Sequence, residues 1–290
     1  MKRRDGGRGT RDEVPRDVPA RFIPHPSSPI PASPWRLLLS PPLSGAENMA
    51  LDEALMACAR ASGESVLRVY SWARPTLSFG RNQAARGAYD PARAAERGVD
   101  VVRRPTGGRA LLHHREVTYS VTAPVSDGEP LGAAYARINR LLLDGLRRLG
   151  VRDLCIAHPA ARAPLPTGAP CFETPTAGEL VAGGAKLVGS AQYREGGALL
   201  QHGSILVDDD QTTLLAELAT RPMAGVPAPA TLRRLLRRAP DVQEVASALF
   251  DAVREREDAD AAEMAMGAAL AAAAAALRAR YEDAGWTWRR

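Results

Sequence analysis

The stretch that decides the fold is ELVAGGAKLVGSAQYREGGALLQHGSILV, residues 179–207. It contains three runs with the composition of β-strands, at 179–181, 186–191 and 198–207. A Gly-Gly step separates each run from the next, and connections this short join antiparallel neighbours. The stretch therefore predicts three antiparallel strands with turns at Gly183-Gly184 and Gly196-Gly197.

Upstream of this unit the chain gives further helix and strand signals. Ser44 and Glu47 have the spacing of a capping box, and apolar residues recur behind them at helical intervals up to Gly63. A second helix is predicted over 134–149, and strands over 66–71, 76–79, 99–103 and 117–122. The fold class is therefore α+β, with a mixed, largely antiparallel sheet flanked by helices.

Composition divides the chain into three segments. Residues 1–34 are rich in Arg, Asp, Gly and Pro and lack an apolar period, which predicts a disordered basic tail. Residues 35–255 are expected to form the main domain. Residues 256–290 are predicted to be a C-terminal helical segment that packs on it.

The formal net charge of +5 is concentrated near the start of the chain. Residues 1–21 contain seven basic and four acidic side chains, so the other 269 residues share a charge of +2. No basic binding face follows from this balance, and a nucleic-acid partner is not expected. No apolar run approaches the roughly 18 residues that span a bilayer, and none follows the twin arginine near Met1. We expect a cytoplasmic protein without a membrane partner.

Lysine is rare in this sequence. Only Lys2 and Lys186 are lysines, whereas 36 residues are arginine. The ammonium group is a compact charge whose pKa shifts on burial, unlike the guanidinium group. Lys186 is therefore a candidate for a role that arginine cannot fill, and chance retention is the alternative.

The first candidate binding segment is RRPTGGRALLH, residues 103–113. Gly107 and Gly108 allow backbone amides to approach a ligand closely. Arg103, Arg104 and Arg109 would supply charge for a phosphate or carboxylate. A surface turn with solvated arginines is the alternative, because the spacing fits no standard phosphate-binding motif.

The three cysteines argue against a disulfide framework, since their number is odd. Cys58 lies on a helical stripe and Cys155 in an apolar segment, which predicts two buried small hydrophobes. Cys171 lies in a loop between two prolines and precedes Lys186 by 15 residues. If the chain folds back, the ammonium favours the thiolate and activates Cys171 as a nucleophile. An incidental surface thiol is the alternative.

Small residues on two predicted strands leave room for a ligand beside the sheet. They are Gly189 and Ser190 on one strand and Gly203 on the other. His202 is a candidate general base or hydrogen-bonding support, with a purely structural histidine as the alternative. No His, Cys and Asp set has metal-ligand spacing, so no metal site is predicted.

Together these segments resemble the lipoate/octanoate protein ligase and transferase family, which shares its fold with biotin protein ligases. The likeness runs from about Trp35 to the end of the chain. It rests on the segments NMALDEA (48–54), RRPTGGRALLH (103–113), EVTYSV (116–121), KLVGSAQ (186–192) and QHGSI (201–205). Cys171 followed by Lys186 is similar to the octanoyltransferase branch called LipM. The chain departs from the family at His114, where an aspartate is usual.

The resemblance implies octanoyl transfer from octanoyl-acyl carrier protein to a lysine of a lipoyl domain, such as glycine cleavage system protein H. In that branch the cysteine matching Cys171 carries an acyl thioester and the lysine matching Lys186 tunes it. No cofactor is then required. Two alternatives stay open: an ATP-dependent lipoate–protein ligase, which needs ATP and Mg, and a non-catalytic binding protein on the same scaffold.

Overall fold

A computed structural model describes residues 33–125, 128–157, 178–208, 213–221 and 228–290. The predicted tail therefore lies almost wholly outside the described residues, and so does the loop that contains Cys171. The strands are β1 (Trp35–Leu39), β2 (Ser65–Tyr70), β3 (Thr76–Phe79), β4 (Asp100–Arg103), β5 (Leu111–His113), β6 (Glu116–Pro124), β7 (Leu154–Ile156), β8 (Leu180–Ala182), β9 (Ala185–Glu195), β10 (Ala198–Leu206) and β11 (Ala262–Glu263). The helices are α1 (Gly45–Ser62), α2 (Pro91–Glu96), α3 (Leu131–Arg148), α4 (Leu214–Leu218), α5 (Leu232–Leu236), α6 (Val242–Arg256), α7 (Ala268–Glu282) and α8 (Ala284–Thr287).

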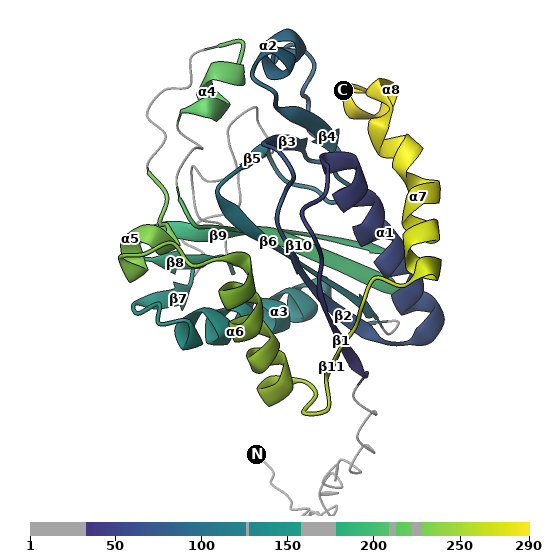
Figure 1. Cartoon of the computed structure of the whole chain (residues 1–290), viewed down its shortest axis with the longest axis vertical. Helices are drawn as coiled ribbons and strands as arrows, with labels where there is room; N and C mark the ends of the chain where they lie inside the picture. The colour runs from purple at the N-terminus through teal and green to yellow at the C-terminus, as the bar shows by residue number, and fades with distance from the viewer. Residues whose placement is uncertain (1–32, 126–127, 158–177, 209–212, 222–227) are drawn as a thin grey trace, which may run out of the picture. The chain divides into compact units, whose positions relative to one another are not determined.

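The larger sheet has eight strands in the order β11-β1-β2-β6-β10-β9-β8-β7 (Figure 1). β8, β9 and β10 form the predicted antiparallel unit. Gly183, Gly184, Gly196 and Gly197 all have positive φ, which glycine adopts without steric penalty. These glycines therefore fix both turns, as the sequence predicts.

Helix α1 begins and ends where the sequence predicts. Ser44 accepts a hydrogen bond from the Glu47 amide, and the Glu47 side chain accepts one from the Ser44 amide. Gly63 closes the helix in the left-handed conformation. These two caps place α1 against the sheet with Asp52 and Asn48 fully buried.

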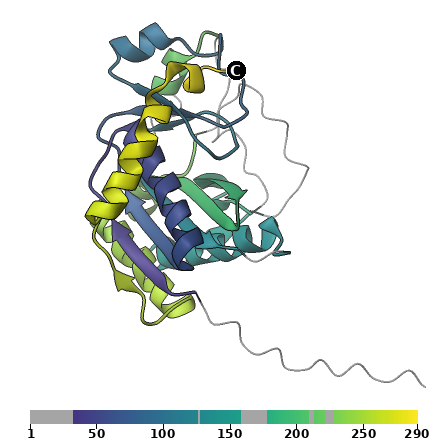
Figure 2. The same cartoon turned by 90° about the vertical axis from the view of Figure 1, so that its right-hand side faces the viewer.

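Helices cover both faces of the larger sheet. Residues of β6 such as Tyr119 share an apolar core with Leu142 of α3 and Leu249 of α6. The alternate residue Ser120 faces α1 and donates a hydrogen bond to Asp52. Figure 2 shows α7 in yellow lying along α1 in purple.

Parallel pairing of β1 is a feature that the sequence analysis did not predict. β1 pairs in parallel with β2, and the two strands are joined through α1. It also pairs in parallel with β11, from near the end of the chain. Parallel neighbours need a long crossover and therefore leave no turn signal in the sequence.

A second sheet of three strands, in the order β4-β3-β5, contains the arginine–glycine segment. β3 pairs in parallel with β4 and antiparallel with β5. Leu77 and Phe79 of β3 pack with Tyr89 and with Leu218 of α4. This small core supports the loop between β4 and β5.

The last described residues pack on this small sheet. Trp286 Nε1 donates to the Arg103 carbonyl oxygen at 2.9 Å, and the Trp288 ring lies 5.2 Å from that of Phe79. The amides of Ala85 and Arg86 donate to the Arg290 carbonyl oxygen. The chain end is therefore attached to the loop that follows β3.

Two predictions about cysteine burial are wrong. Cys58 and Cys155 are both exposed. Cys155 lies on β7, the edge strand of the sheet, where Leu154 points inward and Cys155 outward. Cys58 lies near the C-terminal end of α1, beside other exposed residues.

In the described part of the chain, no helix combines the length and apolar character needed to cross a membrane.

Candidate active site

The glycine-rich loop packs backbone to backbone against the end of β3. A β-carbon on Gly80 would fall 2.0 Å from the Gly108 carbonyl oxygen, closer than any side chain permits. The Arg81 amide donates to the Thr106 carbonyl oxygen at 2.7 Å. Gly108 itself has a φ of 94°, which also favours glycine. These contacts hold Gly107 and Gly108 in one position.

Arg103 and Arg104 are buried, and their guanidinium groups bind backbone carbonyls. Arg103 Nη1 donates to Gly80 O at 2.6 Å and to Gln83 O at 2.8 Å. Arg104 Nη2 donates to the carbonyl oxygens of Gly107 and Arg109, each at 2.8 Å. Both arginines therefore shape the loop, while Arg109 is half-buried.

A buried carboxylate lies behind this loop. Asp52 accepts hydrogen bonds from Arg68 Nη1 at 2.7 Å, Ser120 Oγ at 2.8 Å and Tyr70 Oη at 3.1 Å. Burial alone would raise the pKa of Asp52, but the Arg68 guanidinium and hydrogen bonds from His202 and Ser120 outweigh it, so that pKa is lowered. Asp52 is therefore ionised at neutral pH.

His202 links this carboxylate to the glycine-rich loop. Its Nδ1 lies 3.0 Å from Asp52 Oδ2, and its Nε2 lies 2.7 Å from Thr106 Oγ1. Burial lowers the pKa of His202, although Asp52 opposes the shift. A neutral imidazole beside a carboxylate donates from Nδ1, so Nε2 accepts the Thr106 hydroxyl proton. Helix α1, strand β10 and the loop are thus joined in one chain of hydrogen bonds.

A second buried histidine, His113, lies on β5, the strand that follows the same loop. His113 Nε2 lies 2.9 Å from Ser78 Oγ, and its Nδ1 lies 3.0 Å from Glu116 Oε1. The Trp72 ring stacks on the imidazole at a centroid distance of 4.0 Å and donates from Nε1 to Glu116. His113 is thereby fixed in position and orientation.

A pocket with a cavity volume of about 30 Å³ lies between these two histidines. That volume holds one or two water molecules, so a larger ligand requires its walls to move apart. Its lining residues are Met49, Tyr70, Trp72, Arg104, Gly108, Leu111, His113, Thr118, Gly189, Ser190, Ala191, His202 and Gly203. A β-carbon on Gly203 would fall 2.4 Å from Gly189 O, so glycine is required there for the strands to pack.

Lys186 forms a buried ion pair on the β8–β9 hairpin. Its Nζ lies 2.8 Å from Glu179 Oε1, and both side chains are almost completely buried. The ion pair therefore fixes the position of the Lys186 amino group. Cys171 lies outside the described residues, so its expected proximity to Lys186 stays a prediction.

The structure brings together six of the predicted site residues in one pocket lining. They are Arg104, Gly108, Gly189, Ser190, His202 and Gly203. Arg103, Gly107, Arg109 and Lys186 do not line it. Within the described residues, no group of three or more His, Cys, Asp or Glu side chains is arranged to hold a metal ion.

Several buried polar residues around this pocket and around Lys186 were not predicted from the sequence. Asp52, Thr106, His113 and Glu116 are buried and hydrogen-bonded near the pocket, and Glu179 is ion-paired with Lys186. One signal was available: Asp52 lies at helical spacing among apolar residues that pack inward. A charged residue at such a position needs a buried partner.

The architecture is that of the lipoate protein ligases. A putative lipoate protein ligase from T. acidophilum with bound lipoic acid has a TM-score of 0.71 and 23% identity, over 88% of this chain and 99% of that one. A lipoate-protein ligase A bound with ATP has the same TM-score and identity, over 88% and 98%. The predicted α+β fold class is confirmed.

Sequence comparison defines the family. Residues 44–254 match the model of the lipoyl protein ligase A/B catalytic domain, so this chain belongs to that family. Octanoyltransferase LipM of Kyrpidia tusciae is 47% identical over 192 residues, which are 63% of this chain and 70% of the relative. LipM of Carboxydothermus hydrogenoformans is 44% identical over 188 residues, 63% and 69% of the two chains. The predicted family resemblance is confirmed.

Proposed function

We infer that this chain is an octanoyltransferase of lipoate biosynthesis. It moves an octanoyl group from acyl carrier protein, through a cysteine thioester, to a lysine of a lipoyl domain. The observation that carries this conclusion is the 47% identity to a LipM octanoyltransferase. An acyltransferase of this kind requires no ATP or metal ion.

The first half-reaction is assigned to Cys171. Its thiolate attacks the thioester carbonyl carbon of the donor, a new carbon–sulfur bond forms, and the donor's carbon–sulfur bond breaks. The phosphopantetheine thiolate leaves and takes up a proton. Lys186 favours the Cys171 thiolate electrostatically, and its ion pair with Glu179 at 2.8 Å fixes the position of the amino group.

The second half-reaction regenerates the free cysteine. The acceptor lysine, in its neutral amine form, attacks the carbonyl carbon of octanoyl-Cys171. The carbon–nitrogen bond forms, the carbon–sulfur bond breaks, and the thiolate returns to Cys171. The proton lost by the amine passes to solvent or to a basic group of the site. Backbone amides of Gly107, Gly108 or Gly189 are proposed to stabilise the oxyanion.

The acyl chain is proposed to enter the pocket between His113 and His202. The cavity there is about 30 Å³, smaller than an octanoyl group, so its walls must move apart when the chain binds. Met49, Leu111 and Trp72 give it apolar walls. Burial of a hydrocarbon chain contributes roughly 0.8 kcal/mol per methylene. The Asp52–His202–Thr106 chain of hydrogen bonds keeps the glycine-rich loop fixed beside this pocket.

The ligase alternative has weaker support. The ligase structures with lipoic acid or ATP are 23% identical to this chain and share its fold. The 44–47% identical relatives are octanoyltransferases. Position 171 is a cysteine, as an acyl-thioester mechanism requires.

Intact-mass measurement tests this function. The protein is incubated with octanoyl-acyl carrier protein without ATP, and we expect the mass increment of one octanoyl group. The Cys171→Ser variant should show no increment, whereas Cys58→Ser and Cys155→Ser should retain it as matched controls. Octanoylation of a lipoyl domain only in the presence of Mg-ATP, with full activity of Cys171→Ser, would instead establish the ligase.

A further inference from the structure

Four arginines surround the junction between the chain end and the loop after β3: Arg81, Arg86, Arg289 and Arg290. We call these four residues the arginine rim. Arg86 and Arg290 are exposed, and the other two are half-buried. Three of their side chains are held by neighbours, so the rim is a structured surface.

Aromatic rings and backbone carbonyls provide that support. Arg289 lies 3.9 Å over the Trp286 ring and donates to the Arg81 carbonyl oxygen at 2.5 Å. Arg86 Nε donates to the Trp288 carbonyl oxygen at 3.2 Å. Arg81 lies 4.7 Å over the Tyr193 ring. Stacking on aromatic faces leaves the guanidinium charge uncompensated.

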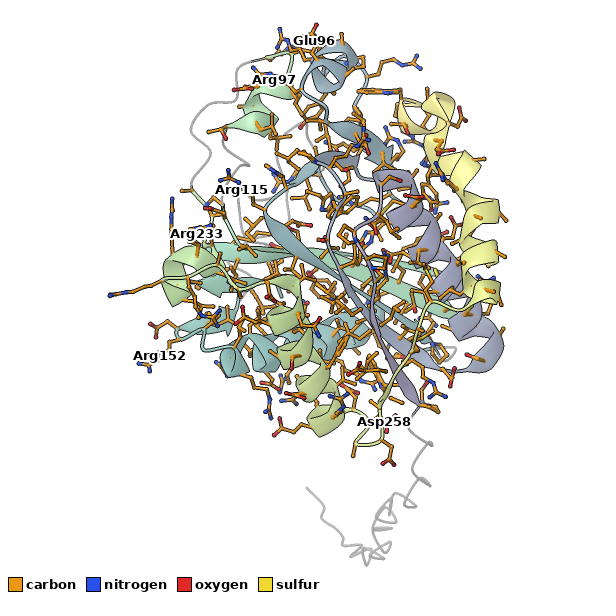
Figure 3. All side chains as sticks on the ribbon, in the orientation of Figure 1. Glu96, Arg97, Arg115, Arg152, Arg233 and Asp258 are labelled. Atoms are coloured by element: carbon orange, nitrogen blue, oxygen red, sulfur yellow. The ribbon has the colours of Figure 1, made fainter. Side chains whose placement is uncertain are left out.

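No carboxylate among the described residues forms an ion pair with any of these four arginines. Many arginines elsewhere are paired: Arg97 with Glu217, and both Arg115 and Arg233 with Asp208. Figure 3 labels these three arginines, with Arg97 at the top of the view and Arg115 and Arg233 on its left side. Helix α5 also has an arginine cluster, but Asp208 and Glu244 compensate part of it. Glu195 lies near Arg81, since both interact with Tyr193. The rim therefore concentrates four arginines that form no direct ion pair with a side-chain carboxylate of the described residues.

The positive charges of the arginine rim repel one another. Burial lowers the pKa of Arg289, and the nearby Arg290 and Arg81 lower it further. Burial lowers the pKa of Arg103 to about 10, with added repulsion from Arg289 and Arg290. Like charges held together in this way are unfavourable until an anion binds them.

The rim lies beside the candidate acyl pocket. Arg81 follows Gly80, which packs directly on the pocket residue Gly108. The ring that Arg81 covers, Tyr193, is two residues beyond the pocket residue Ala191. A protein bound at the rim would therefore be next to the glycine-rich loop.

We propose that the arginine rim is the docking surface for the protein that delivers the acyl thioester, and that this donor presents an acidic face. The proposal rests on the octanoyltransferase function and assigns its donor a place on the structure. The phosphodiester of a phosphopantetheine arm adds negative charge to the donor. The acceptor lysine approaches as a cation and is repelled by the rim, which favours the donor over the acceptor as its occupant.

Charge reversal tests the rim. The double variant Arg86→Glu/Arg290→Glu is compared with Arg140→Glu/Arg152→Glu, which changes the net charge equally at exposed positions outside the rim. For octanoyl-acyl carrier protein at low salt we expect KM to rise about tenfold in the rim variant and to stay unchanged in the control. The increase should shrink at high salt, because ions screen exposed charges.

A small, uncharged thioester donor distinguishes an effect on docking of the donor protein from an effect on catalysis. With octanoyl-N-acetylcysteamine the rim variant should keep the wild-type rate. An equal loss with both donors, an equal effect of the control variant, or a raised KM for the lipoyl domain alone would overturn the proposal. Failure of the wild-type protein to transfer the octanoyl group from either thioester would instead refute the proposed function. If the double variant is unfolded in circular dichroism, Arg86→Gln/Arg290→Gln gives the same comparison with a smaller expected rise.

Discussion

Two buried charged centres in the described part of the chain are built in opposite ways. Asp52 gathers partners from distant parts of the chain, including Arg68 at a separation of 16 residues and His202 at 150. Lys186 pairs with Glu179 across a single hairpin. The long-range centre joins helix, sheet and loop into one scaffold, whereas the local centre places one ammonium group. Damage to the first should appear mainly in stability, whereas damage to the second should appear in both stability and chemistry.

The largest effect is expected at the local centre. In the proposed mechanism Lys186→Met removes the ammonium that favours the Cys171 thiolate, so formation of octanoyl-enzyme should slow about 100-fold or more. It also leaves the buried Glu179 carboxylate without that ammonium, which costs about 3–5 kcal/mol. Single-turnover kinetics and urea denaturation measure the two effects. The double variant Glu179→Gln/Lys186→Met should recover the stability lost in Lys186→Met but not the rate of octanoyl-enzyme formation. Recovery of both would contradict the proposed role of Lys186 in activating Cys171.

At the long-range centre, Asp52→Asn should act first on stability. It leaves the Arg68 charge buried without its carboxylate, with an expected loss of about 3–5 kcal/mol in the free energy of unfolding. Asp144→Asn breaks the exposed ion pair with Arg256 and serves as the control, with at most about 1 kcal/mol. Equal losses of unfolding free energy in Asp52→Asn and Asp144→Asn, measured by urea denaturation, would show that Asp52 contributes no more than an exposed ion pair.

A smaller effect is expected where this centre meets the loop. Thr106→Val keeps the side-chain shape but leaves His202 Nε2 without the hydroxyl donor, at a cost of about 1–3 kcal/mol. Thr106→Ser should retain most of the stability. A loss in Thr106→Ser as large as in Thr106→Val would assign the effect to packing of the methyl group instead.

The smallest effect is a pH dependence that belongs to the long-range centre alone. Because burial lowers the pKa of His202 below its ordinary 6.5, the unfolded state binds a proton at higher pH than the folded state. Stability should therefore fall as pH drops below about 6.5, and again near the acid limit where Asp52 protonates. Urea denaturation between pH 5 and 8 measures this slope. An unchanged slope in His202→Gln would show that another group causes it.

The contrast between the centres also explains what the sequence could predict. The capping box of α1 and the glycine turns of the β8–β9–β10 unit are local signals, and the structure contains both. Glu179 could have been predicted in the same way, because it flanks the same turn as Lys186. The partners of Asp52 could not be predicted, since no local pattern relates residue 52 to residue 202. The parallel pairing of β1 with β11 could not be predicted for the same reason.

Short strands and helix ends limited the prediction of burial. Apolar neighbours suggested an interior position for Cys155, but a three-residue edge strand exposes every second side chain. For the arginines, the sequence predicted charge available to a ligand. That prediction stays untested, but the structure shows that Arg103 and Arg104 also bind backbone carbonyls, which only the folded loop brings within reach.

The hydrogen-bond chain through His202 has a thermodynamic consequence for the whole protein. Thr106, His202 and Asp52 come from the loop, the sheet and a helix, so these three elements are tied together beside the cavity. Amide protons near the loop should then exchange with deuterium only in global opening events. Occupancy by a fatty acyl group would raise the melting temperature of the entire domain.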